Sequence, residues 1–550
     1  MKNDIQQSLR TLIADALRDL AWASYAGDDL YLDLPTDPRF GDLSSNVALR
    51  LSKALRKPPR EIASSIVENI TKQLKQHALK DSISEVKVEG AGFINFYFSN
   101  LYLLTQLKQL LAEGSNFFRS SLGENERVLI EFVSANPTGA LSVAHARQAA
   151  VGDILANILS FIGFAVQREY YLNDEGNQIN ILGNSTALRI KELQGETIEF
   201  PENYYQGDYI YDIAREAKKR GVAHDALGDF AAGYILDIIK QELDDFKVKF
   251  DCWFSQKELR TSGKIEQVFR ALKEKGFLYE EGGAQWFKST AFGDDKDRVV
   301  VKSDGSYTYL APDIAYHQEK YRRGFQWLIN LWGPDHHGYI NRLKASVEAF
   351  GHKPDSLSIV IVQLASIFRD GKIVEMSTRK GQYITLREVL DEVGVDAARF
   401  FFVMRRTSSH LDFDLEVAKK QTAENPVYYV QYAHARICSI MRNLKEQGQK
   451  DNKSNDTDLS VIKEAQEIAL IKKIMQFPSM LFICYKTVDP FMLTVYLQEL
   501  AESFHKFYDA HRVISSDERL TQARLCLIDA TRTTLACGLE LLGISRPEKM

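Results

Sequence analysis

The stretch that decides the fold is RVLIEFVSANPTGALSVAHARQAAVGDILANIL, from Arg127 to Leu159. Val128–Phe132 is an apolar run that predicts a buried strand, and the apolar pairs after His145 repeat with the period of about 3.6 residues that predicts a helix. A short loop containing Pro137 and Gly139 joins the two. Such a junction gathers free backbone N–H groups and the positive end of the helix dipole at one point. In an open parallel sheet that point lies at the carboxyl edge, where nucleotides usually bind.

The loop itself is a weak signal when it is taken alone. It matches neither the dinucleotide pattern GxGxxG nor the phosphate-loop pattern GxxxxGK[ST], so both of these sites are excluded. An ordinary connection between a strand and a helix, without any ligand, is the alternative that the local pattern leaves open.

Outside this stretch, residues of about 122 to 385 alternate strand and helix patterns, which is typical of a mostly parallel sheet. A long helical insertion, Asp208–Phe250, separates the two halves of this sheet. The strand patterns that we assign to it are Val128–Phe132, Val166–Tyr171, Val299–Lys302, Trp327–Leu331 and Ser358–Gln363.

The two ends of the chain have different patterns. The N-terminal region shows helical periodicity over residues 5–22 and 44–75 and strand patterns over 86–88 and 93–98. After Thr385, which forms a T-x-x-E capping box with Glu388, the chain is helical to Leu542. We therefore predict an α/β plus all-α protein with four regions, an N-terminal α+β domain, a Rossmann-type catalytic domain, connecting helices and a C-terminal helical bundle, over residues 1–115, 120–385, 386–424 and 425–550.

Composition sets the broad class. The hydrophobic share of 45% and the charged share of 26% in 550 residues are those of a soluble globular protein with several domains. Eighteen consecutive apolar residues are not found, the N-terminal segment predicts a surface helix and not a signal peptide, and the five cysteines form no CxxC pair. These features favour the cytoplasm and no membrane. With a net charge of −5, any polyanionic partner must be met by local basic patches.

Five further segments follow SANPTG and its helix in an order that resembles arginyl-tRNA synthetases, a family of class I aminoacyl-tRNA synthetases. SANPTG with the helix that follows it resembles the HIGH signature region of that class. The five are DRVVVKSDGSYTYLAPDIAYH (297–317), LWGPDHHGYINRLKA (331–345), VEMSTRKGQ (374–382), DEVGVDAARFFFVMR (391–405) and ENPVYYVQYAHARI (424–437). The resemblance covers nearly the whole chain. It implies ATP, L-arginine and tRNA(Arg) as substrates, a monomer, an N-terminal domain that contacts the tRNA elbow, and magnesium that arrives with ATP and not at a dedicated protein metal site.

In the HIGH pattern, this chain has Ser142, Val143, Ala144 and His145. The resemblance implies that His145 donates a hydrogen bond to the ATP phosphates. Ser142 stands where the family has its first histidine; a hydroxyl donates one bond but carries no charge, so weaker stabilisation of the transition state is expected. Ala144 replaces a glycine beside the adenine, and its methyl is expected to crowd the base. The implied ATP-binding residues before these are Ala135, Asn136, Pro137, Thr138 and Gly139.

The second signature of the class closes a cationic loop over the triphosphate. In this chain it has Glu375 at the first position, where the family has lysine, followed by Met376 and Ser377 as implied ATP-binding residues. Arg379 and Lys380 come directly afterwards and are the cations that we assign to catalysis. A plain surface loop with two basic residues is the alternative.

Arginine is planar and always charged, so its recognition calls for carboxylates and a flat polar wall. The resemblance implies that Tyr309 and Asp313 read the guanidinium. Gln256 stands where the family has an acid, so a lower affinity for arginine is expected. The resemblance further implies Ser134 and Asn136 at the α-amino and carboxylate groups, and Asp335 and His336 in the same pocket. A helix start with a packed aromatic is the alternative for Tyr309 and Asp313.

The C-terminal region resembles the anticodon-binding domain of the family. Tyr428 and Tyr432 are four residues apart and share one helix face, and Arg436 follows on that face. Aromatic rings and cations of this kind stack on bases and pair with phosphates in RNA complexes, so we assign these three residues to tRNA binding. Ring pairs at this spacing also occur in protein cores, which is the alternative.

The sequence thus predicts an arginine–tRNA ligase that forms arginyl-adenylate and then arginyl-tRNA. A second reading follows from the four altered positions, Ser142, Ala144, Gln256 and Glu375, which all point toward loss of activity. On that reading the chain is a catalytically weakened paralogue that binds tRNA and acts as a binding or regulatory protein.

Overall fold

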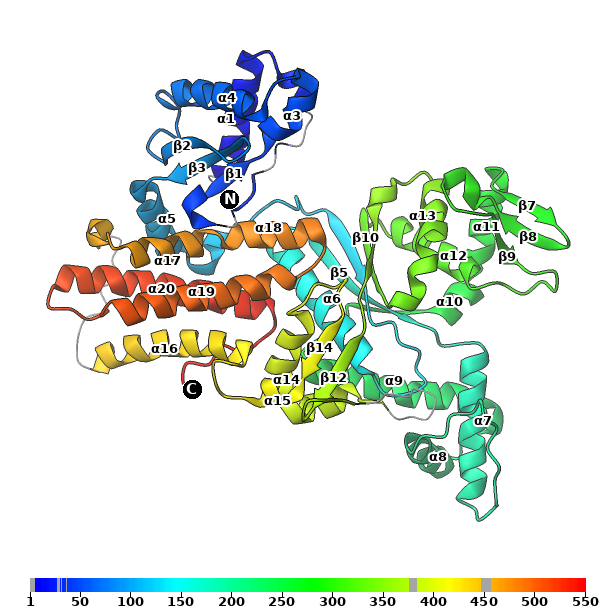
Figure 1. The fold of residues 1–550 in the computed structure, drawn as a ribbon. Coiled ribbons are helices and arrows are strands. Elements are labelled where there is room, and N and C mark those ends of the chain that lie inside the picture. Colours follow the sequence, from blue (N-terminus) through cyan, green and yellow to red (C-terminus); the bar gives the residue numbers. More distant parts are fainter. Residues whose placement is uncertain (1–4, 27–29, 31, 36, 375–382, 447–456) are drawn as a thin grey trace.

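A five-stranded parallel sheet forms the centre of the computed structural model, which describes residues 5–26, 30, 32–35, 37–374, 383–446 and 457–550 (Figure 1). The strand order is β11-β10-β4-β5-β6, so the chain runs outward from β4 to β6 and then returns to the other side of β4. This is the doubly wound order, and it confirms the expected Rossmann-type fold. The strands are β4 (Arg127–Glu131), β5 (Ala165–Leu172), β6 (Cys252–Ser255), β10 (Trp327–Trp332) and β11 (Leu357–Ile361).

Helix α6 (Val143–Phe161) crosses the sheet directly after β4 and is buried almost all round. At Gly152 a side chain is impossible, because a Cβ atom there would lie 2.3 Å from the ring of Phe132. Helix α6 also buries polar side chains, and these have partners. Asp153 accepts a hydrogen bond of 2.6 Å from Arg399, which is itself fully buried. The junction that the sequence singled out is therefore fixed by tight packing on both sides.

One predicted strand of the parallel sheet was wrong. Residues 299–302 belong to β9 (Arg298–Val301), which pairs with β8 in a separate antiparallel sheet. The fifth parallel strand is β6, which follows the helical insertion and was not predicted. Both segments are short and only partly buried, so their apolar patterns do not distinguish the two sheets. The separate sheet contains β7 (Leu278–Glu281), β8 (Ala284–Phe287) and β9.

The remaining elements of this central part flank the parallel sheet. Figure 1 shows α7 and α8 projecting beyond the parallel sheet, α9 running back toward α14 (Leu386–Val403), and α10 to α13 lying beside the β7–β9 sheet. The helices are α7 (Asn177–Glu192), α8 (Tyr209–Arg220), α9 (Leu227–Asp245), α10 (Gln256–Thr261), α11 (Lys264–Glu274), α12 (Leu310–Arg322) and α13 (Ile340–Ala349). A third small sheet contains β12 (Ala365–Arg369), β13 (Lys372–Ile373) and β14 (Leu411–Asp414).

The N-terminal unit has its own apolar core beneath the antiparallel sheet β1-β3-β2. The helical pattern predicted over residues 44–75 is broken here, because Pro58 and Pro59 end one helix and begin the next. The elements are α1 (Ile5–Asp19), α2 (Ala23–Ala26), β1 (Leu43–Ser45), α3 (Val47–Leu55), α4 (Pro59–Leu74), β2 (Ile83–Glu89), β3 (Phe93–Phe98) and α5 (Asn100–Glu113).

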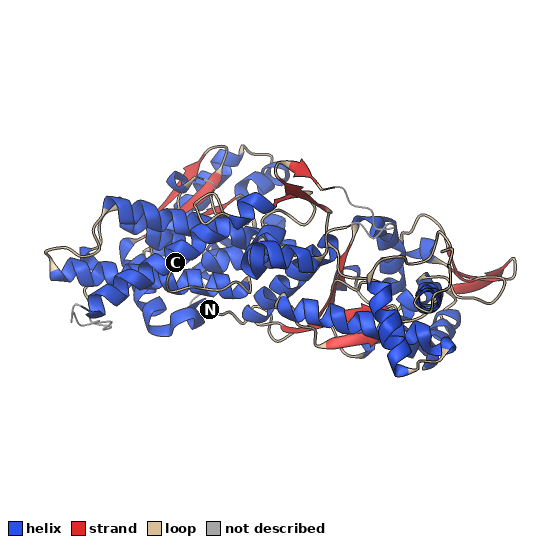
Figure 2. Ribbon diagram, turned by 90° about the horizontal axis from the view of Figure 1, so that it is seen from below, coloured by secondary structure: helices blue, strands red, loops and turns tan. Residues whose placement is uncertain are grey.

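The C-terminal third is a helical bundle. Thr385 and Glu388 form the predicted capping box at the start of α14, with Glu388 N donating to Thr385 Oγ1 at 3.1 Å. Figures 1 and 2 show an elongated molecule with this bundle at one end and the β7–β9 sheet near the other. The helices are α14 (Leu386–Val403), α15 (Leu415–Lys419), α16 (Pro426–Glu446), α17 (Ala465–Met475), α18 (Phe477–Thr487), α19 (Phe491–Ala510) and α20 (Glu518–Leu541).

Among the described residues, one stretch, Ala465–Thr487, is long and apolar enough to cross a membrane, with a mean hydropathy of 1.4. It comprises α17 and α18, whose residues Leu470, Ile474 and Phe477 are fully buried in the protein core. Core helices of soluble proteins meet the same criteria, so this composition is weak evidence for a membrane span.

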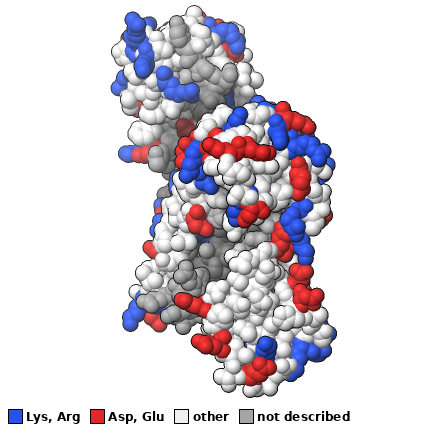
Figure 3. Space-filling model, turned by 90° about the vertical axis from the view of Figure 1, so that its right-hand side faces the viewer, with Lys and Arg blue, Asp and Glu red and all other residues white. Residues whose placement is uncertain are grey.

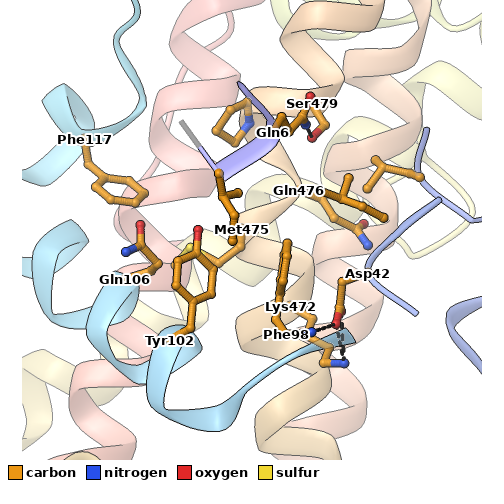
Figure 4. Close-up of a pocket in the computed structure, with 14 residues that line it drawn as sticks. Gln6, Asp42, Phe98, Tyr102, Gln106, Phe117, Lys472, Met475, Gln476 and Ser479 are labelled. Atoms are coloured by element: carbon orange, nitrogen blue, oxygen red, sulfur yellow. Dashed lines mark hydrogen bonds and ion pairs between the residues drawn. The ribbon is translucent and has the colours of Figure 1, made fainter. Parts of the chain in front are cut away.

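The N-terminal unit docks on the C-terminal bundle through a small polar cluster (Figure 4). Asp42, which is only 8% exposed, pairs with Lys472 of α17 at 2.9 Å and accepts a hydrogen bond from the backbone N–H of Phe98. Gln6 of α1 donates to Ser479 of α18 at 2.7 Å. These contacts lock two units that lie more than 400 residues apart in sequence.

The substitution Lys472→Met should loosen this docking. It leaves the buried Asp42 carboxylate without its cation, a change that typically costs about 3 kcal/mol. We expect faster amide hydrogen exchange in β1 and α17 than in the wild-type protein. The matched control is Lys473→Met, because the ion-pair partner of Lys473, Glu499, is half-exposed. Equal exchange in the two variants would show that the Asp42 pair does not hold the units together.

Candidate active site

A cleft of about 840 Å³ opens at the carboxyl ends of β4, β5 and β10. Its walls are the loops that follow these strands, the first turns of α6 and the start of α12. The order of the strands reverses between β4 and β10, and in doubly wound sheets ligands bind at such a switch point. The fold therefore places a ligand-sized cleft where the sequence placed the strand–helix junction.

The loop after β4 is strained. Val133 and Ser134 have φ angles of 67° and 40°, a left-handed conformation that is unfavourable for a residue with a branched side chain such as valine. The turn is held by Ser134, whose Oγ donates to Glu131 and accepts from the backbone N–H of Tyr171. Strain of this kind clusters at functional sites, where the surrounding structure supports it. Here it turns Ser134, Ala135 and Asn136 toward the cleft.

His145 reaches the cleft from the first turn of α6 as a neutral hydrogen-bond donor. Its Nδ1 accepts from the backbone N–H of Ser142 at 3.2 Å, and the Oγ of Ser142 lies 3.1 Å from the same nitrogen. A neutral imidazole with an accepting Nδ1 carries its proton on Nε2. Burial lowers the pKa of His145 to about 4, although Asp335 opposes this shift. The histidine can thus donate from Nε2 but carries no charge near neutral pH.

Ser142 does not line the cleft, although the sequence assigns it to catalysis. It is the N-cap of α6, and its contacts described above orient His145. Ala144 does line the cleft. Ser142 therefore contacts the site only through His145, among the residues that line the cleft in the described part of the chain.

Pro137, Thr138 and Gly139 lie beside the cleft and not in its lining. Their loop is clamped by two tyrosines: Tyr209 OH donates to the carbonyl of Thr138 at 2.7 Å, and Tyr383 OH donates to the carbonyl of Ala140 at 3.0 Å. The next residues pair with the segment after Tyr383 through the bridge between Ser142 and Thr385. The predicted second signature, with Glu375, Met376, Ser377, Arg379 and Lys380, lies outside the described residues.

Asp313 lines the cleft from the first turn of α12. Within the described part of the chain its carboxylate forms no ion pair, and burial together with the charge of Glu131 raises its pKa to about 7. Glu131, by contrast, is paired with the fully buried Lys320, whose Nζ lies 2.6 Å from Oε2. At the start of α12, Asp313 is therefore the acidic group that is available to a cationic ligand.

The other predicted arginine-binding residues lie around Asp313. Tyr309, the N-cap of α12, is 81% exposed at the rim. Asp335 and His336 stand on the opposite loop after β10, mostly exposed and 3.4 Å apart. Gln256, the first residue of α10, completes this part of the lining.

The sequence analysis missed several lining residues, chiefly Tyr171, Asn173, Glu175 and Gln178. They belong to the segment YLNDEGNQ, which ends β5 and enters α7. The available signal was the run of polar residues at the end of a predicted strand, because the carboxyl ends of neighbouring parallel strands meet at one edge. Asn136 contacts this segment directly, donating to Gln178 at 2.7 Å.

The three residues assigned to tRNA lie on α16, in the C-terminal bundle and away from the cleft (Figure 1). The rings of Tyr428 and Tyr432 are stacked with centroids 6.2 Å apart, and His505 of α19 stacks on Tyr432. Arg436 is exposed and donates to Tyr508. Since Tyr432 is 36% exposed, this ring pair forms a surface stack and not part of the core.

Figure 3 shows Lys and Arg side chains interspersed with Asp and Glu on the face that contains the β7–β9 sheet. In the described residues no group of three or more His, Cys, Asp or Glu side chains is arranged to hold a metal ion. The cleft lining combines apolar side chains, such as Val133 and Trp332, with hydrogen-bonding groups and a few carboxylates.

Three family descriptions match the chain in succession. Residues 7–98 match "Arginyl tRNA synthetase N terminal domain", residues 106–441 match "tRNA synthetases class I (R), catalytic domain", and residues 430–550 match "DALR anticodon binding domain". Among solved structures, a putative arginyl-tRNA synthetase of Campylobacter jejuni is 36% identical with a TM-score of 0.76, covering 82% of this chain and all of its own. Arginyl-tRNA synthetase of Thermus thermophilus shares the fold over the full length of both chains, at 23% identity and a TM-score of 0.79.

Curated relatives are similar over their whole length. An arginine–tRNA ligase of Citrifermentans bemidjiense is 45% identical, with 100% of both chains covered. One of Geobacillus kaustophilus is also 45% identical, over 95% of this chain and 94% of its own. With the doubly wound sheet, the cleft at its switch point and the helical bundle in place, these matches show that the chain belongs to the arginyl-tRNA synthetase family.

Proposed function

We propose that this protein is an arginine–tRNA ligase that works in the cytoplasm as a monomer. ATP and L-arginine give arginyl-adenylate and diphosphate, and the arginyl group then passes to tRNA(Arg) with release of AMP. The observation that carries the proposal is one cleft containing both a hydrogen-bond donor for phosphate, His145, and an available carboxylate for a cation, Asp313.

In the first step, a carboxylate oxygen of arginine attacks the α-phosphorus of ATP, and diphosphate leaves. Negative charge grows on the phosphate oxygens, which His145 Nε2–H and the positive end of α6 stabilise without moving. Arg379 and Lys380 are proposed to add cationic charge, and magnesium enters with ATP. Ser134 and Asn136 hold the α-amino and carboxylate groups, while Asp313 and Tyr309 hold the guanidinium.

In the second step, the terminal ribose hydroxyl of tRNA attacks the carbonyl carbon of the adenylate, and AMP leaves. The stack of Tyr428 and Tyr432 with Arg436 is proposed to bind anticodon-loop bases and phosphates. The N-terminal unit, locked to the bundle through Asp42 and Lys472, is proposed to contact the tRNA elbow.

Arginylation of tRNA and arginine-dependent ATP–diphosphate exchange, measured with tRNA present, test this function. We expect both reactions. Tight tRNA binding without exchange would instead establish the weakened, tRNA-binding paralogue. Full-length identity of 45% to curated ligases supports the enzyme.

For the tRNA surface, Tyr432→Ala should raise the KM for tRNA about tenfold, since base stacking is worth about 1–3 kcal/mol per base. Tyr432→Phe keeps the ring and should retain the wild-type KM. The KM for arginine should stay unchanged in both variants, because α16 lies outside the cleft. A KM for tRNA that is unaffected by the alanine variant would remove Tyr432 from the tRNA interface.

A further inference from the structure

The neutral residue Gln256 has a carboxylate beside it in the cleft. Gln256 Nε2 donates to Glu175 Oε1 at 3.3 Å, and the hydroxyl of Tyr171 donates to Gln256 Oε1 at 3.0 Å. Glu175 comes from the loop between β5 and α7, and Gln256 from the start of α10. All three side chains line the cleft. At position 256, where the family has an acid, this chain has a glutamine. The carboxylate in this part of the cleft lining comes instead from Glu175.

The two contacts also fix the amide of Gln256. Because its nitrogen faces Glu175, its oxygen is held toward Tyr171 and can accept a further hydrogen bond from a ligand. The amide and the carboxylate together present acceptors at adjacent positions. A planar guanidinium, with five N–H donors in a fixed fork, matches such a pair better than a single ammonium does.

Glu175 has one carboxylate oxygen on Gln256 and the other on Arg260. The Arg260 guanidinium lies 2.7 Å from Oε2 and is half-exposed, so solvent screens this cation more than it screens the carboxylate. The Glu175 side chain itself is only 15% exposed. A carboxylate in such a shielded position attracts a cation more strongly than one on the open surface.

Glu175 and Asp313 act on the same region of the cleft. Burial raises the pKa of Tyr171, and the charges of Asp313, Glu131, Asp174 and Glu175 raise it further. Of these, Glu131 is paired with Lys320, and Asp174 is engaged by Ser255 and the backbone N–H of Lys257. Figure 1 shows α10 next to α12, and Glu175, Gln256 and Asp313 line the same cleft. Asp313 and Glu175 remain as the carboxylates for a cationic ligand.

We propose that Glu175, together with the amide of Gln256 that it orients, is a second recognition element for the guanidinium of arginine, in the same cleft as Asp313. This inference rests on the proposed function and deepens it. The negative charge in this wall has been transferred from position 256 to position 175, so arginine affinity does not depend on an acid at 256. The substitution at 256 is then no sign of a weakened enzyme.

The test is the variant Glu175→Gln, which keeps the shape and removes the charge. We expect the KM for arginine to rise about tenfold, with kcat within about twofold of the wild type. Inhibition by L-citrulline, the neutral analogue of arginine, should keep its Ki. The double variant Glu175→Gln with Gln256→Glu restores one carboxylate in the same wall and should return the KM for arginine to within about threefold of the wild type. The matched control is Glu258→Gln, an exposed acid on α10 that does not line the cleft.

An unchanged KM in Glu175→Gln would overturn the inference. A raised KM that the double variant fails to restore, or a Ki for citrulline that rises in parallel, would overturn it too, since a purely structural role would produce those results. Wild-type activity separates these outcomes from failure of the proposed function, because without wild-type exchange the function itself is wrong.

Discussion

Replacing His145 with alanine is expected to lower kcat for arginine-dependent ATP–diphosphate exchange by about 100- to 1000-fold. The loss of one preorganised donor to a developing oxyanion typically has this effect. The KM values for arginine and ATP should change by less than about threefold, because the donor acts mainly on charge that grows in the transition state. His145→Asn supplies an N–H from its amide and should recover part of the rate. His410→Asn, at an exposed histidine outside the cleft, is the control.

The pH dependence of this effect follows from the lowered pKa. Since burial holds the pKa of His145 near 4, the ring is neutral from about pH 5.5 upward. The ratio of wild-type to His145→Ala rates should therefore be constant between about pH 6 and 8. A ratio that rises steeply as the pH falls through 6.5 would mean that a charged imidazolium performs the chemistry, and the geometry inferred for Nε2 would be wrong.

For Asp313→Asn, we expect the KM for arginine to rise about 10- to 100-fold with little change in kcat. The asparagine is isosteric but cannot form the charge-assisted pair, which is worth about 1.5–3 kcal/mol. The KM for ATP should stay near the wild-type value. A variant in which the KM values for ATP and arginine rise together would point to a collapsed cleft and not to a lost guanidinium contact.

The raised pKa of Asp313 gives the wild-type enzyme a distinctive pH profile. Arginine binds the ionised carboxylate, and in the free protein this group holds a proton below about pH 7. The KM for arginine should therefore fall about tenfold per pH unit as the pH rises toward 7, and should level off above it. Asp313→Asn should abolish this dependence. A wild-type KM that does not vary between about pH 5.5 and 7 would show that the carboxyl is already ionised without its ligand.

The sequence and the structure agree best where a local pattern has one physical solution. The apolar run before His145 forms a buried strand, and the apolar pairs after it form a helix, as predicted. Thr385 and Glu388 form the predicted capping box. Periodicity was ambiguous for short, half-buried segments, which explains why β9 was placed in the wrong sheet and β6 was not predicted. Strand partners depend on contacts between distant residues, which a local pattern does not contain.

At the altered signature positions, too, the sequence and the structure lead to different interpretations. From the sequence, Ser142 and Gln256 are losses at single positions. In three dimensions Ser142 orients His145, and Gln256 is paired with Glu175, a residue 81 positions away. A change that looks damaging in one motif can be balanced by a side chain from another strand end, because the site is built from several loops.

The sequence by itself determined the class of fold and the junction where β4 meets α6, since these follow from periodicity and motif order. The expected arginine and phosphate residues come from the family resemblance and stay predictions. Only the tertiary structure decided which groups carry charge. Burial makes His145 neutral, Lys320 pairs with Glu131, and Asp313 is left with a pKa near 7. The ionisation of a group depends on solvent exposure and on neighbours brought together by folding, and neither quantity is present in the order of residues along the chain.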